Sequence, residues 1–200
     1  IFFVFILCFT PFIFGFLIPF VRLLTWLLYS SFNFEDMNIV QISFNTIFIS
    51  LIASLSIVCI AFTINFVKNY FNNRIVRKIS ELAILGYSIP GAIIAIGILK
   101  LNSHINTSFN ILIIGSVCGL VFAYGVRFLA VAWQPIQSSM KKQCASINHA
   151  SRVLSASSTT SLFKINLPIL RKPLLIAALI VFIDVAKELP LTLILRPVNF

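Results

Sequence analysis

Long apolar stretches with few charged residues most constrain how this chain folds. Only 10% of its 200 residues are charged and 60% are apolar, against roughly 25% and 45–50% in soluble domains. Five stretches have about the 20 residues that a helix needs to cross a bilayer. The sequence therefore excludes a soluble or disordered chain and predicts an all-α membrane protein. The predicted spans are residues 1–29, 44–67, 82–99, 109–133 and 173–195.

Prolines and glycines interrupt two of these spans. Two prolines and a glycine fall inside residues 1–29, which we interpret as one span or as two pieces. The third span is bent by Gly86, Pro90 and Gly91. Broken helices line the pathway in some transporters, but such a bend also permits a tight helix crossing. Both interpretations of Pro90 and Gly91 stay open.

The distribution of basic residues predicts a topology. The formal net charge is +10, yet the basic side chains lie in breaks between spans, which argues against a nucleic-acid partner. The loops 68–81 and 134–172 are basic, whereas the loop 30–43 is acidic. Positive loops stay in the cytoplasm, so the first span is expected to start inside.

The chain is expected to be one transmembrane domain, residues 1–200, truncated at both ends, because it begins and ends without polar tails. Its cysteines form no CxxC pair, and no metal site is predicted. Gly115, Gly119 and Ala123 follow one another at four-residue spacing, which is typical of a small-residue face for close helix packing.

The loop 134–172 is long for a compact protein. Within it Ile147, Ala150 and Leu154 recur at i, i+3 and i+7, which predicts a short amphipathic helix with a small-residue face. A second short helix is expected over about 159–166, ended by Pro168. These helices either dock on a soluble partner or lie on lipid headgroups.

This loop resembles the EAA loop of type I ABC importer permeases. The family pattern is Glu-Ala-Ala, three residues, Gly, nine residues, Ile, one residue, Leu-Pro. Residues 147–157 (INHASRVLSAS) and Ile165-Asn166-Leu167-Pro168 keep that spacing. His149, Ser151 and Ser155 stand where the family has Glu, the second Ala and Gly. Residues 86–92, 124–131, 187–190 and 195–197 are similar to the ferric iron branch.

The resemblance implies a transport subunit rather than an enzyme. A separate cytoplasmic ATPase binds ATP, and this chain binds no cofactor. The chain lacks a phosphate-binding loop, because Gly86 and Gly91 are followed by Ala92-Ile93. The other implied partners are a homologous permease half, a periplasmic substrate-binding protein and the bilayer of a bacterial inner membrane. The motif assigns ATPase coupling to His149, Ala150, Ser151, Ser155, Leu167 and Pro168.

Three charges interrupt the fifth span, where each costs about 2.5–3.5 kcal/mol to insert. Asp184 lies about 16 Å along the helix from its predicted start. Lys187 and Glu188 follow at i+3 and i+4, so all three can share one face. They form either an ion pair with a neighbouring helix, through Arg127, or an acidic pathway for a cation such as ferric iron.

Two kinds of alternative function remain open. Within the class, the chain could be a thiamine, sulfate or polyamine permease. Outside it, an ATPase-independent channel or a membrane subunit of a respiratory complex would have similar spans. The spacing through Leu167-Pro168 favours the importer, because neither of these last two proteins requires it.

Overall fold

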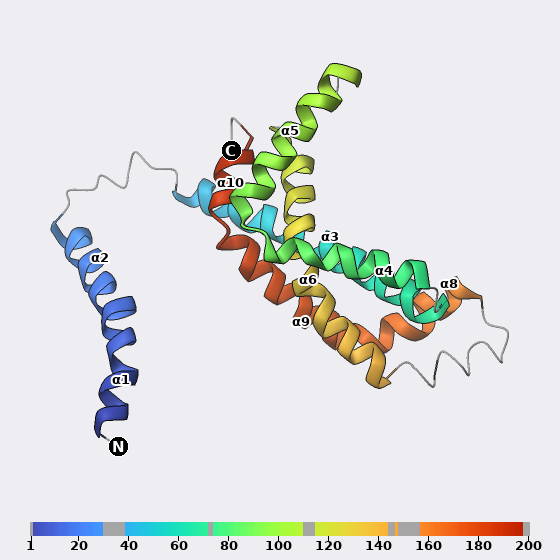
Figure 1. The fold of residues 1–200 in the computed structure, drawn as a ribbon, viewed down its shortest axis with the longest axis horizontal. Helices are drawn as coiled ribbons and strands as arrows, with labels where there is room; N and C mark the ends of the chain where they lie inside the picture. Colours follow the sequence, from blue (N-terminus) through green and yellow to red (C-terminus); the bar gives the residue numbers. More distant parts are fainter. Residues whose placement is uncertain are drawn as a thin grey trace. The chain divides into compact units, whose positions relative to one another are not determined.

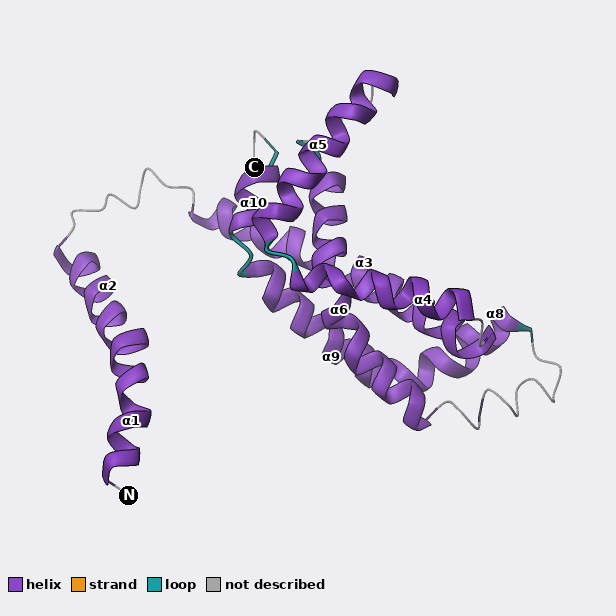
Figure 2. Cartoon of the chain, viewed as in Figure 1, coloured by secondary structure: helices purple, strands orange, loops and turns teal. Residues whose placement is uncertain are grey.

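The computed structural model describes residues 2–29, 39–71, 74–109, 115–143, 147 and 157–197. These residues are almost entirely helical and include no strand (Figure 2). The predicted all-α architecture is confirmed. The chain divides into two units, Ile1–Gln41 and Ile42–Phe200, which we describe separately.

Residues 2–29 of the first unit form one uninterrupted helical stretch. It consists of α1 (Phe2–Phe12), the π-helix η1 (Ile13–Leu17) and α2 (Ile18–Tyr29). The division into two pieces, one of the two interpretations of residues 1–29, is therefore not seen.

The remaining elements form a bundle in which α6 and α9 lie side by side (Figure 1). The chain turns sharply between η3 and α5, and again between α9 and α10. In order, the elements are α3 (Ile39–Phe71), α4 (Arg74–Ala83), the 3₁₀-helix η3 (Ile84–Ser88), α5 (Gly91–Phe109), α6 (Val117–Gln143), α8 (Ser158–Thr160), the π-helix η4 (Ser161–Asn166), α9 (Leu167–Ala186) and α10 (Pro190–Leu195).

Three described helices are long and apolar enough to cross a membrane, within Ile6–Tyr29, Ile39–Tyr70 and Val117–Lys142. The pair Arg74–Ser88 and Gly91–Ser103 makes a fourth if it counts as one span, but it is bent by 116°. The helix α9 is not among them, since its 20 residues carry two basic side chains and Asp184. The chain is an all-helical, multi-pass membrane protein, but five spans are not confirmed.

Both π-helical segments occur just before a proline. Proline lacks an N–H and its ring clashes with the carbonyl four residues back, so it normally ends a helix. Here η1 precedes Pro19 and η4 precedes Pro168. The carbonyl four residues before each proline lies within the wider π-helical turn. In both segments, the backbone N–H of the residue before the proline donates a hydrogen bond to the carbonyl five residues back. These pairs are Ile18 with Ile13 and Leu167 with Leu162.

Consequently the predicted boundaries around the long loop are wrong. Pro168 does not end the short helix, since η4 continues into α9, which starts six residues before the predicted span at Pro173. On the other side α6 continues through Pro135 to Gln143. Ile136 and Met140 are buried there, so the apolar stripe of α6 extends beyond the predicted end at residue 133.

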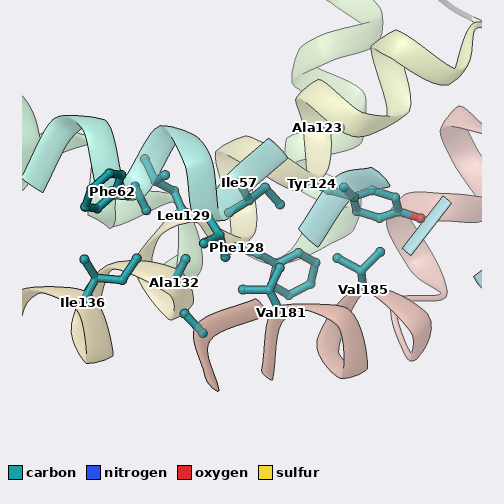
Figure 3. Packing of buried hydrophobic residues seen from close by; sticks show 14 of the residues in the cluster. Ile57, Phe62, Ala123, Tyr124, Phe128, Leu129, Ala132, Ile136, Val181 and Val185 are labelled. Carbon is teal, nitrogen blue, oxygen red and sulfur yellow. The ribbon is translucent and has the colours of Figure 1, made fainter. Parts of the chain in front are cut away.

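The core lies between α3, α6 and α9 (Figure 3). Aromatic side chains such as Phe62, Tyr124 and Phe128 fill it. Ala132 on α6 and Ala177 on α9 are fully buried, and such small residues let helices approach closely. Of the predicted small-residue face, Gly115 is not part of the helix: it precedes α6 with a φ of +78°.

The bend between η3 and α5 packs closely against α6. A Cβ on Gly86 would overlap the backbone carbonyl oxygen of Val126. Only glycine permits this approach of η3 to α6. The bend therefore holds the start of α5 next to the middle of α6.

Candidate functional site

The charged residues of the predicted fifth span lie where the helix breaks. The helix α9 ends at Ala186, and Lys187 and Glu188 donate their backbone N–H groups to Ile183 and Val185. Pro190 begins α10, because without an N–H it fits the first turn of a helix. The predicted fifth span is thus broken between Ala186 and Pro190, and Asp184 and Glu188 do not share one helical face as the sequence predicts.

Glu188 forms a buried ion pair with Arg127 in the middle of α6. Arg127 Nη2 and Glu188 Oε2 are 3.3 Å apart, and the two side chains are 20% and 8% exposed. The other carboxylate oxygen accepts the N–H of Leu191 at 3.4 Å, which caps the start of α10. One carboxylate therefore fixes α10 and joins the helix break to α6.

Gly91, the first residue of α5, completes this arrangement. A Cβ at this position would overlap both Arg127 Nη1 and Glu188 Oε1. The absence of a side chain lets the positive end of α5 meet the carboxylate. Two candidates from the sequence, Gly91 and Glu188, are therefore brought together, and we call Gly91, Arg127 and Glu188 the charged centre.

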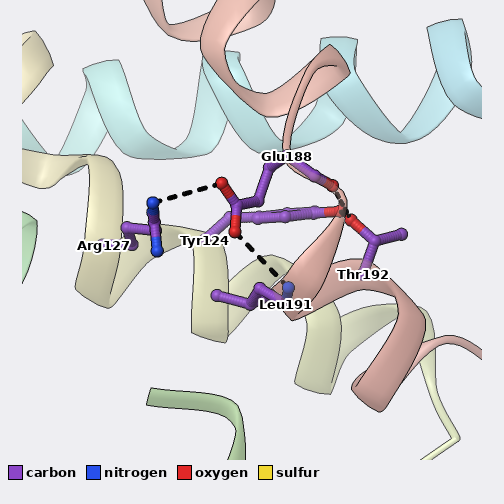
Figure 4. A network of polar contacts seen from close by, with 5 residues as sticks. All are labelled: Tyr124, Arg127, Glu188, Leu191 and Thr192. Atoms are coloured by element: carbon purple, nitrogen blue, oxygen red, sulfur yellow. Dashed lines mark hydrogen bonds and ion pairs between the residues drawn. The ribbon is translucent and has the colours of Figure 1, made fainter. Parts of the chain in front are cut away.

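A second polar contact reinforces the break (Figure 4). The Thr192 hydroxyl donates to the carbonyl of Glu188, so the Tyr124 hydroxyl donates to Thr192 Oγ1, 2.7 Å away. Tyr124 lies one turn before Arg127 on the same face of α6. This face of α6 thus binds the break itself, through Glu188, and α10, through Thr192.

Asp184 faces a different environment. It lines a cleft of about 890 Å³ between α6, α9 and η3, together with Tyr87, Gln134 and Lys141. On α6 the cleft is also lined by the polar Gln137 and Ser138, beside the apolar Ala130 and Val131. Among the described residues no three His, Cys, Asp or Glu side chains form a metal-binding group. The cleft can therefore contact a cation or polar solute weakly, without trapping it.

The other predicted site residues lie apart from the charged centre. Lys187 is exposed and forms no ion pair within the described chain. Pro90 is exposed at the bend before α5. Leu167 and Pro168 are exposed in the first turn of α9. The remaining coupling candidates, His149, Ala150, Ser151 and Ser155, lie outside the described residues.

The ion pair through Arg127 is present, but sequence reasoning missed the residues around it. Tyr124 and Arg127 are three positions apart in an apolar helix, which is a signal that the two act on one face. The apolar pattern places the glutamines and the lysine of the cleft in the loop 134–172. Extending the apolar stripe of α6 through Ile136 would have placed them on a helix.

No protein-family model matches this sequence, and no curated protein matches it.

Replacing Glu188 by Ala should lower the free energy of unfolding by about 3–5 kcal/mol, because it leaves a buried guanidinium without its counter-charge. The matched control is Lys187→Ala, which removes the exposed charge next to Glu188 and should change the free energy of unfolding by less than about 0.5 kcal/mol. Unfolding of the purified protein in detergent measures both. Equal stability of the two variants would contradict the structural role of the charged centre.

Proposed function

We propose that this chain is the membrane-spanning permease subunit of an ATP-driven importer of the type I ABC class, in a bacterial inner membrane. The continuity of α9 supports this most strongly. It starts at Leu167-Pro168, the end of the EAA-like motif, and runs unbroken to Ala186 beside the charged centre. Its 20 residues span about 30 Å. One helix therefore connects the motif expected to contact an ATPase with the charged interior.

In this proposal the loop around residues 149–155 docks on a cytoplasmic ATPase subunit. ATP binding brings two such subunits together and displaces the loop. Because α8, η4 and α9 follow one another without a break, the displacement passes along α9. The break at Lys187–Leu189 and the bend before α5 then change how α6 packs against its neighbours. Here α9 with α10 is the last of five spans, and the basic loops face the cytoplasm.

The cleft beside Asp184 is proposed as part of the pathway. Carboxylate, amide and hydroxyl oxygens suit hard cations, and ferric iron delivered by a periplasmic binding protein is the proposed substrate. One carboxylate with Lys141 nearby binds such an ion weakly. Weak contact is what passage requires, since tight ligation would retain the ion. A homologous permease half completes the pathway.

Replacing Ala150 by Glu should abolish co-purification of the ATPase, because a larger, charged side chain replaces a small one at the proposed contact. Thr159→Glu is the matched control, since Thr159 is exposed and lies outside the motif positions. Affinity purification of the complex from membranes measures both. Undiminished ATPase binding by the Ala150 variant would contradict the proposed coupling.

Replacing Asp184 by Asn should reduce uptake of radioactive iron at least tenfold, because the cleft then loses its negative charge. Lys142→Gln is the control: it removes a charge from α6 one residue from the cleft-lining Lys141. Uptake into cells that express the complete transporter is the measurement, with competition by thiamine, sulfate and polyamines. Wild-type iron uptake by the Asp184 variant would contradict a pathway along this cleft.

A further inference from the structure

The helix α4 exposes both apolar and basic side chains. Ile75, Ile79 and Leu82 form a stripe at i, i+4 and i+7, and they are 67%, 61% and 66% exposed. Arg74 and Lys78, one turn apart, are exposed as well. A helix with this combination is typical of the boundary between lipid headgroups and acyl chains.

A groove leads from α4 into the apolar part of the bundle. Lys78, Glu81, Leu82 and Leu85 line a pocket of about 330 Å³. The two leucines also line a groove of about 790 Å³, whose other walls come from α3, η3 and α6. The pocket and the groove therefore adjoin, with a charged end at α4 and an apolar remainder.

The groove is long and laterally open. Along α6 it runs from Val117 to Leu129, twelve residues or about 18 Å of helix. Leu85 and Phe122 on its walls are more than half exposed. Among the described residues that line it, Ser56 supplies the one polar side chain apart from the charged end, with Cys118 also on the wall. An elongated, flexible hydrocarbon chain matches this shape.

The charge at the end of the groove determines which kind of lipid headgroup binds there. Three basic residues of α4 against Glu81 give this helix a net charge of +2 (three minus one). Glu81 opposes an anion, but Lys78 lines the same pocket and Arg74 lies one turn from it. Basic residues at this level of a membrane attract anionic lipids.

We propose that this groove binds an anionic phospholipid, with the phosphate of its headgroup at Lys78 and one acyl chain along α3, η3 and α6. The groove shares no lining residue with the Asp184 cleft and contains no residue of the charged centre. It does not depend on the proposed transport function.

The test uses the full chain purified in detergent and transferred to nanodiscs that contain phosphatidylglycerol, phosphatidylcholine or both. Native mass spectrometry measures the retained lipid. The wild type should retain phosphatidylglycerol in preference to phosphatidylcholine. Lys78→Gln should weaken that preference about fivefold, the effect of one basic residue near an anionic surface. The exposed Lys142 on α6 provides the control, and Lys142→Gln should leave the preference unchanged.

A second pair of variants tests the acyl-chain part. Gly125 lines the groove and a Cβ there meets no atom within 4 Å, so Gly125→Leu fills the groove without a clash at Cβ. Gly97 on α5 is equally open but lies outside the groove, which makes Gly97→Leu the matched control. Gly125→Leu should reduce retention of both lipids, and Gly97→Leu of neither.

Wild-type retention in either Lys78→Gln or Gly125→Leu would overturn the proposal. Equal retention of the two lipids by the wild type would also overturn it. The proposal would also be overturned if the protein formed a dimer that covers this face and retained no phospholipid.

Discussion

The ion pair between Arg127 and Glu188 is the interaction on which the arrangement of the second unit depends. A buried charge is tolerated only when it is paired and hydrogen bonded, and Glu188 achieves this through Arg127 and the N–H of Leu191. Each partner also imposes a constraint on the backbone. The carboxylate needs the helix break before Pro190, and the guanidinium needs glycine at position 91. Three helices thus meet at one pair of charges.

The two carboxylates of this region have different roles because the helix ends between them. Asp184 is still on α9 and lines the cleft, whereas Glu188 lies beyond the last turn and points to α6. A continuous helix would have placed both on one face, four residues apart. The break therefore separates a structural charge from one that is open to solute. This division is what allows the Asp184 cleft to be proposed as a pathway while the charged centre keeps the bundle together.

The apolar pattern was enough to predict a helical membrane protein. The cost of charges inside a span was enough to suggest Arg127 as a partner for the charged segment 184–188, but it did not identify Glu188 as the residue that pairs. The positions of helix ends were harder to predict. Pro19 and Pro168 are preceded by π-helical turns, which the hydrophobic pattern does not indicate, so the helices pass through them. The apolar pattern places Gln134 and Lys141 in a loop, because polar residues dilute the apolar stripe of α6 there. Tyr124 and Thr192 are 68 residues apart, and no local pattern relates them.

In the proposed coupling, α9 transmits movement from the loop around residues 149–155 to the charged centre as one continuous helix. Spin labels at the exposed positions 167 and 187 test it most directly in the assembled transporter, by the distance between them with and without ATP. Twenty residues of helix predict about 30 Å between the two backbones in both states. A distance that shortens with ATP would place a hinge within α9, for example at Pro173, and would contradict the account.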